Sequence, residues 1–143
     1  MRVCFDTSTL VAALLKQHPH HAIAFPHLKA AQNGTIKAHL TTHALAELFS
    51  TLTALPLKPR LSPTDVQRLL DSSILPHFTI IALSGKSYKQ AITLTAAQNL
   101  ASGAIYDALH IVGARAAQCE RLLTLNLKHF KALAPGDAMI VVP

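Results

Sequence analysis

The chain has 143 residues, half of them hydrophobic, with seven Asp and Glu against thirteen Lys and Arg and a net charge of +6. This length and apolar content predict a single domain over residues 1–143 with its own core, and no long basic run indicates a disordered tail. No stretch approaches the roughly 20 apolar residues of a membrane span and no signal peptide is recognisable, so we expect a cytoplasmic protein with no membrane contact.

Hydrophobic patterning predicts strands that alternate with helices along the whole chain. In chain order we expect a strand at Arg2–Asp6, a helix to Lys16, a helix at His20–Gln32, a strand at Ile36–Leu40, a helix at His43–Leu55, a helix at Ser62–Leu75, a buried strand at Phe78–Leu83, helices at Ser84–Asn99 and Ala104–Ala117, a strand at Arg121–Leu125, a loop or short helix at Asn126–Ala134, and a strand at Met139–Val142. This alternation predicts an α/β sandwich with a mainly parallel sheet.

Helix boundaries are marked by capping residues. Thr7 or Ser8 is expected to cap the first helix, and Thr41 with Thr42 the third. The segment Ser62–Asp65 has the pattern of a capping box with proline at the first helical position.

The seven carboxylates fall into two groups. Four have ordinary structural settings in caps, turns or exposed helix positions: Asp65, Asp71, Glu120 and Asp137. The other three, Asp6, Glu47 and Asp107, lie in the most apolar segments of the chain. A buried carboxylate is costly unless it is paired or bound to a cation, and no Lys or Arg adjoins these three in sequence. Three clustered acids therefore indicate a hard divalent metal, Mg²⁺ or Mn²⁺.

The positions of these acids support a common site. Asp6 ends the first strand, Asp107 lies near a helix N-terminus, and Asn126 follows the strand Arg121–Leu125. Sites in open parallel sheets form beyond the carboxyl ends of the strands, so the three segments are expected to converge there.

Each acid also has a simpler interpretation. Asp6 could cap the following helix, Glu47 could be exposed on an amphipathic helix, and Asp107 could be a first-turn acid stabilised by the helix dipole. A site based on histidine is a weaker alternative: His43 and Glu47 share a helix face, but the His-Glu-x-x-His spacing of zinc hydrolases is missing. His110 is interpreted as a packed helix residue.

Four segments of the chain resemble motifs of the PIN-domain family, and more narrowly the toxins of VapBC toxin–antitoxin pairs. The segments are Val3–Ser8, Thr42–Glu47, Gly103–Leu109 and Leu123–Phe130, in that order. The resemblance covers essentially the whole chain. It implies a three-layer α/β/α sandwich, and an Mg²⁺- or Mn²⁺-dependent endoribonuclease that is the toxin of a type II pair.

The resemblance also implies roles for individual residues. Asp6, Glu47 and Asp107 would be the catalytic metal ligands, and Asn126, which stands where many members have Asp, would offer an uncharged oxygen. Thr124 would position an acid or water, with Ser8 and His43 beside the ligands. Candidates for RNA contact are Arg60, Lys128 and His129. The implied partners are RNA, a VapB-like antitoxin and a second copy of the chain.

Other functions remain open at the level of sequence. A PIN module could bind nucleic acid without cleaving it, or process RNA without an antitoxin. A purely partner-binding protein is a third possibility, for which apolar Leu10, Leu14 and Leu15 on a presumed surface helix would serve as contacts. A dinucleotide- or phosphate-binding protein is disfavoured, because no G-x-G-x-x-G or P-loop segment is present.

Overall fold

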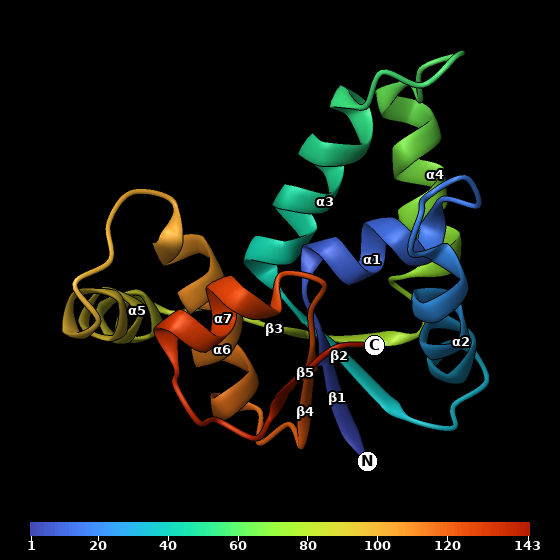
Figure 1. The fold of residues 1–143 in the computed structure, drawn as a ribbon. Coiled ribbons are helices and arrows are strands. Elements are labelled where there is room, and N and C mark those ends of the chain that lie inside the picture. Colours follow the sequence, from blue (N-terminus) through green and yellow to red (C-terminus); the bar gives the residue numbers. More distant parts are fainter.

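A computed structural model describes residues 1–143 and has five strands and seven helices (Figure 1). The strands are β1 (Arg2–Phe5), β2 (Lys37–Thr41), β3 (Phe78–Ile81), β4 (Arg121–Leu123) and β5 (Ile140–Val141). They form one sheet in the order β3-β2-β1-β4-β5, and every neighbouring pair is parallel. The expected sheet is confirmed, and it is parallel throughout.

Helices cover both faces of this sheet. They are α1 (Thr7–Leu14), α2 (His21–Gln32), α3 (Thr42–Ala54), α4 (Pro63–Ser73), α5 (Gly85–Ala97), α6 (Ala104–Ala116) and α7 (Leu127–Leu133). Helices α1 to α4 lie on one side of the sheet and α5 to α7 on the other (Figure 1), which confirms the three-layer architecture. None of the helices has the length and apolar character needed to cross a bilayer.

The two faces of the sheet bury separate apolar clusters. Strand β1 shows the alternation of a strand that is covered on both sides, because Val3 and Phe5 belong to the cluster under α1 to α4 and Cys4 to the cluster under α5 to α7.

Two expectations about burial are wrong. Leu10 and Leu15 are buried core residues, and Leu14 packs against the same cluster, so the apolar face of α1 is used inside the fold. The strand near residue 80 is an edge strand that exposes Ile80.

Strand β4 ends two residues earlier than expected, because the backbone of Leu125 and Asn126 bonds to side chains and not to a neighbouring strand. The fourth strand ends at Leu123. Thr124 N still donates to Val141 O of β5 at 3.0 Å, but Leu125 N donates to Ser8 Oγ at 3.0 Å and Asn126 N to Thr124 Oγ1 at 2.9 Å. These bonds turn the chain toward α1 and α7. The segment after β4 thus joins the end of β1 instead of extending the sheet.

Helix caps follow the sequence with two corrections. Ser62 and Asp65 form the expected capping box, and the Thr41 hydroxyl accepts from Ala44 N at 3.1 Å, while Thr42 is already helical. The cap of α1 is Asp6, neither Thr7 nor Ser8. Asp6 has the extended backbone of a cap residue and its side chain accepts from Thr9 N.

Parallel register brings three strand ends to one edge of the sheet. Phe5 is opposite Leu123 in β4, and Cys4 is opposite His39 in β2. Consequently the residues that follow β1, β2 and β4 share the carboxyl edge, where the helices α1 and α3 begin.

Candidate metal centre

Asp6 lies at the centre of this edge and is almost fully buried, with 2% of its surface exposed. Its Oδ1 accepts from Thr9 N at 2.8 Å, and the Ser8 hydroxyl lies 2.8 Å from both carboxylate oxygens. The Thr124 hydroxyl donates to Oδ2 at 2.6 Å. Asp6 therefore caps α1, as its simpler interpretation proposes, and is also held in one orientation by three donors.

Thr124 connects two strand ends that are far apart in sequence. It follows β4 directly, its side chain is fully buried, and its Oγ1 donates to Asp6 while accepting from Asn126 N. Ser8 makes a second link, because its hydroxyl accepts from Leu125 N. Both residues expected beside the first acid thus contact it.

Glu47 lies in the second turn of α3 and is half-buried. Its Oε1 accepts from Thr7 Oγ1 and from His110 Nε2, each at 2.9 Å, and His43 Nε2 is 3.1 Å away. Burial acts to raise the pKa of Glu47, but the hydrogen bonds from His110 and Thr7 outweigh it and leave the pKa below its usual value. Glu47 is therefore ionised at neutral pH.

The histidines beside Glu47 are His43 and His110. His39, four residues before His43 in the sequence, lies in β2, where its Nδ1 bonds to the backbone oxygen of Lys37 at 2.9 Å. His110 is buried and bonds to Glu47, although its position in the sequence suggested only packing. The spacing Asp107-x-x-His110 was the available signal, since residues three apart share a helix face. Burial lowers the pKa of His43 and keeps its ring neutral.

Asp107 has fewer hydrogen-bond and ion-pair partners than Asp6 or Glu47. It lies in the first turn of α6, and its one ion-pair contact is with His129, whose Nδ1 is 4.0 Å from Oδ2. Burial raises the pKa of Asp107 to about 6; His110 and His129 oppose this rise, and the Asp6 and Glu47 carboxylates add to it. The three acids are thus close enough for their charges to act on one another.

The donors at this edge fit a hard divalent cation. None of the ion pairs in the structure brings Lys or Arg to Asp6, Glu47 or Asp107; their only ionisable partners are histidines. Asp107 keeps a half-buried carboxylate without a Lys or Arg partner, and a bound cation would supply the compensating charge. Carboxylate oxygens are the ligands that Mg²⁺ and Mn²⁺ prefer.

Of the other residues predicted for the site, some lie near the three acids and one does not. Asn126 is the cap residue of α7 and lines a hollow of about 410 Å³ together with Ser8 and Glu47. Lys128 and His129 are exposed in the first turn of α7, and His129 lies beside Asp107. Arg60 is exposed in the loop between α3 and α4, beyond the end of α3 that is distant from the sheet (Figure 1). The structure therefore does not bring Arg60 to the acids.

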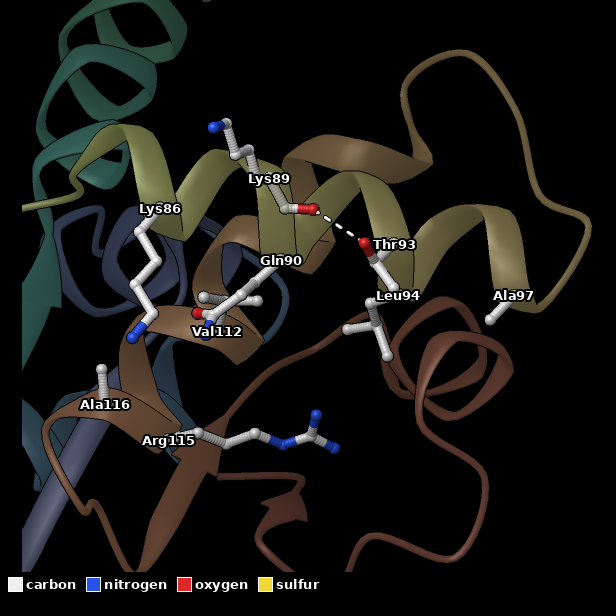
Figure 2. Close-up of a pocket in the computed structure, with 9 residues that line it drawn as sticks. All are labelled: Lys86, Lys89, Gln90, Thr93, Leu94, Ala97, Val112, Arg115 and Ala116. Carbon is white, nitrogen blue, oxygen red and sulfur yellow. Dashed lines mark hydrogen bonds between the residues drawn. The ribbon is translucent and has the colours of Figure 1, made fainter.

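A separate hollow of about 630 Å³ lies between α5 and α6 (Figure 2). Lys86 reaches from α5 toward α6, whereas Lys89 points away from the hollow. Arg115 lines it as well and pairs with Asp137 at 2.8 Å. This hollow contains no acid and lies at the C-terminal half of α6, whereas Asp107 is in the first turn.

Comparison with known proteins identifies relatives over most of the chain. A family model described as the PIN domain matches residues 2–128. Ribonuclease VapC40 of Mycobacterium tuberculosis is 35% identical over 86% of this chain and 85% of the relative. Ribonuclease VapC27 of the same organism is also 35% identical, over 73% of this chain and 70% of the relative.

Solved structures share the fold. VapBC2 from Rickettsia felis, bound to a DNA fragment from its promoter, has a TM-score of 0.66 at 26% identity and covers 92% of both chains. A toxin–antitoxin complex from Klebsiella pneumoniae has a TM-score of 0.68 at 20% identity, over 99% of this chain and 97% of the other. FitAcB from Neisseria gonorrhoeae has a TM-score of 0.66 at 18% identity, over 96% and 95%.

Proposed function

Since the chain belongs to the PIN-domain family, we propose that it is a metal-dependent endoribonuclease and the toxin of a type II toxin–antitoxin pair. The observation that carries the proposal is the grouping of three carboxylates at the carboxyl edge of the sheet, one of them with its pKa raised to about 6 by burial and by the other two acids. Relatives that are 35% identical and named as ribonucleases support the same activity.

In this proposal Asp6, Glu47 and Asp107 hold one Mg²⁺ or Mn²⁺ ion, and Asn126 adds an amide oxygen at the rim. When bound, such an ion supplies a Lewis acid that activates water and offsets charge on a phosphodiester. Because Asn126 brings no charge, a firmly held second ion is not part of the proposal.

The protein's own side chains prepare the site for the ion. Thr124 and Ser8 hold the Asp6 carboxylate in a fixed orientation, and Thr7 and His110 do so for Glu47. Preorganised ligands lose little freedom on binding, which increases metal affinity. Lys128 and His129 would contact the RNA backbone next to Asp107.

The proposed partners follow from the same assignment. Solved relatives of this fold include toxin–antitoxin complexes, so an antitoxin that covers the acidic edge is expected. Pairing of two copies of this chain is expected from the family resemblance alone. The cytoplasm, where the RNA substrate is found, is the expected location. The whole chain, residues 1–143, is assigned to a single PIN domain.

The test is cleavage of labelled RNA by the purified protein with Mg²⁺, with Mn²⁺ and with EDTA. Wild type should cleave only with the metal, and Asp6→Asn and Asp107→Asn should lose at least about 100-fold in rate because a metal ligand is gone. Asp71→Asn removes an exposed acid from α4 and is the matched control, expected to cleave like wild type.

Two results would redirect the assignment. RNA binding without metal-dependent cleavage would favour a non-catalytic binding module, to which the uncharged Asn126 gives some support. Cleavage without growth arrest on expression in cells would favour RNA processing without an antitoxin.

A further inference from the structure

Three side chains beside the proposed metal site form a compact group of their own. They are His43 and Glu47 on α3 and His110 on α6, and one ligand atom from each lies within 4.8 Å of the other two. His110 Nε2 is 2.9 Å and His43 Nε2 is 3.1 Å from Glu47 Oε1. Two imidazole nitrogens therefore converge on one carboxylate oxygen.

The spacing of these atoms suits the coordination sphere of a transition metal. Ligands at about 2.0–2.1 Å from one tetrahedral Zn²⁺ ion lie about 3.3–3.4 Å from one another. Both nitrogen–oxygen distances are within about 0.5 Å of that spacing before any ion is bound, so small side-chain shifts would complete it. Imidazole favours zinc-class ions, whereas Mg²⁺ prefers oxygen ligands, so this group differs in chemistry from the set of three carboxylates.

Hydrogen bonding within the protein satisfies only part of this group. Since an ionised carboxylate only accepts, His110 Nε2 carries the proton that bonds to Glu47. His43 Nε2 is fully buried, and although it lies near Glu47 its geometry makes no hydrogen bond. A buried ring nitrogen without a partner is costly, and a metal ion between the two rings would give it one.

The rings are held in place and remain reachable. The Tyr106 ring stacks on His43 at 5.2 Å between centroids with only 10° between the planes, and Phe130 lies 6.1 Å from His110. A hollow of about 340 Å³, lined by His43, Glu47 and Tyr106, opens to solvent beside the group. An ion can therefore approach Glu47 and the His43 ring from solvent, and it reaches the buried nitrogens through side-chain rotation while the helices stay folded.

The affinity of the group should be moderate. To offer the Nε2 lone pair, His110 must shift its proton to Nδ1, which is buried without a partner. Resident zinc sites give that second nitrogen an acceptor. We therefore expect reversible occupancy that follows the free concentration of the ion.

We propose that His43, Glu47 and His110 form a second site, for a zinc-class divalent ion, which shares Glu47 with the Mg²⁺ site and so inhibits the enzyme when it is occupied. The shared residue makes the two ions compete, because two dications on one carboxylate repel each other and each weakens the binding of the other. The binding part stands on the geometry alone, and the inhibition part rests on the proposed nuclease function.

The binding part is tested with Co²⁺ as a spectroscopic substitute for Zn²⁺ on the full-length protein. Wild type should bind one Co²⁺ with visible d–d absorption, and added Zn²⁺ should displace it. His43→Gln and His110→Gln should each weaken binding by at least about tenfold, because each removes a ligand. His77→Gln is the control, since this histidine precedes β3 at the opposite end of the sheet and should leave binding unchanged.

Several results would overturn the site. The proposed site is wrong if His43→Gln or His110→Gln binds Co²⁺ as tightly as wild type. It is also wrong if a thiolate charge-transfer band assigns the ion to Cys4 or Cys119. Circular dichroism checks that each variant is folded. If His110→Gln fails to fold, Glu47→Gln takes its place, and the same loss of affinity is required.

Inhibition is tested separately by adding Zn²⁺ to Mg²⁺-supported RNA cleavage. The rate should fall, excess Mg²⁺ should partly restore it, and excess Mg²⁺ should also weaken the Co²⁺ absorption in the absence of RNA. Inhibition that Mg²⁺ does not relieve would refute the sharing of Glu47. Absence of any Mg²⁺-supported cleavage would refute the nuclease function. The Co²⁺ spectra would then be the test of the zinc site by themselves.

Discussion

At the scale of single residues, the hydrogen bond from Thr124 to Asp6 is the most informative contact of the site. The two residues are 118 positions apart, and the donor and acceptor are separated by 2.6 Å in a fully buried environment. Such a bond fixes which carboxylate lone pairs remain for a metal. The bond therefore holds the Asp6 carboxylate in a fixed orientation at the proposed site.

Thr124→Val tests this positioning role. The variant keeps the shape of the side chain and removes the hydroxyl, so Asp6 Oδ2 loses its shortest bond and Asn126 N its acceptor. We expect about 10- to 100-fold weaker Mg²⁺ affinity, measured from the metal dependence of cleavage and by calorimetry. Thr79→Val, on the exposed edge strand β3, is the control. Unchanged Mg²⁺ affinity in Thr124→Val would remove Thr124 from the site.

Asp107 lowers the stability of the folded, metal-free protein at neutral pH. Its pKa is about 6 in the folded chain against 3.8 for an ordinary Asp, so the folded state holds its proton more tightly than the unfolded state does. Stability due to this group is fully present below pH ~4 and is lost as the pH rises through about 6. At neutral pH the ionised carboxylate therefore destabilises the metal-free protein.

Asp107→Asn should relieve this cost. In EDTA at pH 7 we expect a gain of about 1–2 kcal/mol in the free energy of unfolding, reduced from the full shift because the side chain is partly exposed and screened by water. The gain should disappear near pH 4, as measured by urea denaturation at both values. Asp71→Asn should show no such difference, and a destabilised Asp107→Asn at pH 7 would contradict the argument.

At the scale of elements, α6 carries the third acid and depends on one glycine to approach the sheet. A Cβ atom on Gly113 would lie 2.6 Å from Thr41 Cγ2 and 3.3 Å from Leu83 Cδ2. Thr41 caps α3, which carries Glu47. The absence of a side chain at Gly113 thus lets α6 lie against the end of β2, so that Asp107 and His110 reach the site.

Gly113→Ala should overpack this contact. Since helix propensity favours alanine, a loss of stability would come from the clash, and we expect about 1–3 kcal/mol from chemical denaturation. Gly85→Ala, at the first position of α5 with open space around it, should be neutral or slightly stabilising. A stable Gly113→Ala with unchanged Mg²⁺ affinity would show that the close approach is unnecessary.

At the scale of the whole molecule, charge is divided between a basic exterior and an acidic edge. The net charge is +6, yet three of only seven acidic side chains are gathered at the proposed metal site. A polyanion is therefore attracted by the surface and repelled at the site itself unless a cation is bound there. RNA affinity and metal occupancy should rise together.

Lys128→Ala measures the surface contribution. In an Asp6→Asn background, where RNA is not cut, the change should weaken binding about equally for all RNA sequences and reduce the slope of log affinity against log salt by about 1. Lys37→Ala is the control, because Lys37 begins β2 at the opposite end of the sheet. Equal effects of the two changes would mean that RNA is held by overall charge and not by α7.

The sequence by itself determined the alternation of strands and helices, the capping box at Ser62 and the three acids that stand in apolar segments. These features could be predicted because hydrophobic periodicity, caps and the cost of a buried carboxylate act over a few residues.

The tertiary structure alone decided which distant side chains meet. Parallel pairing of β1 with β4 places Thr124 against Asp6, and the packing of α6 places His110 against Glu47, 63 residues away. It also placed Leu10 and Leu15 in the core. Such contacts depend on register and helix packing over the whole chain, which no local pattern records.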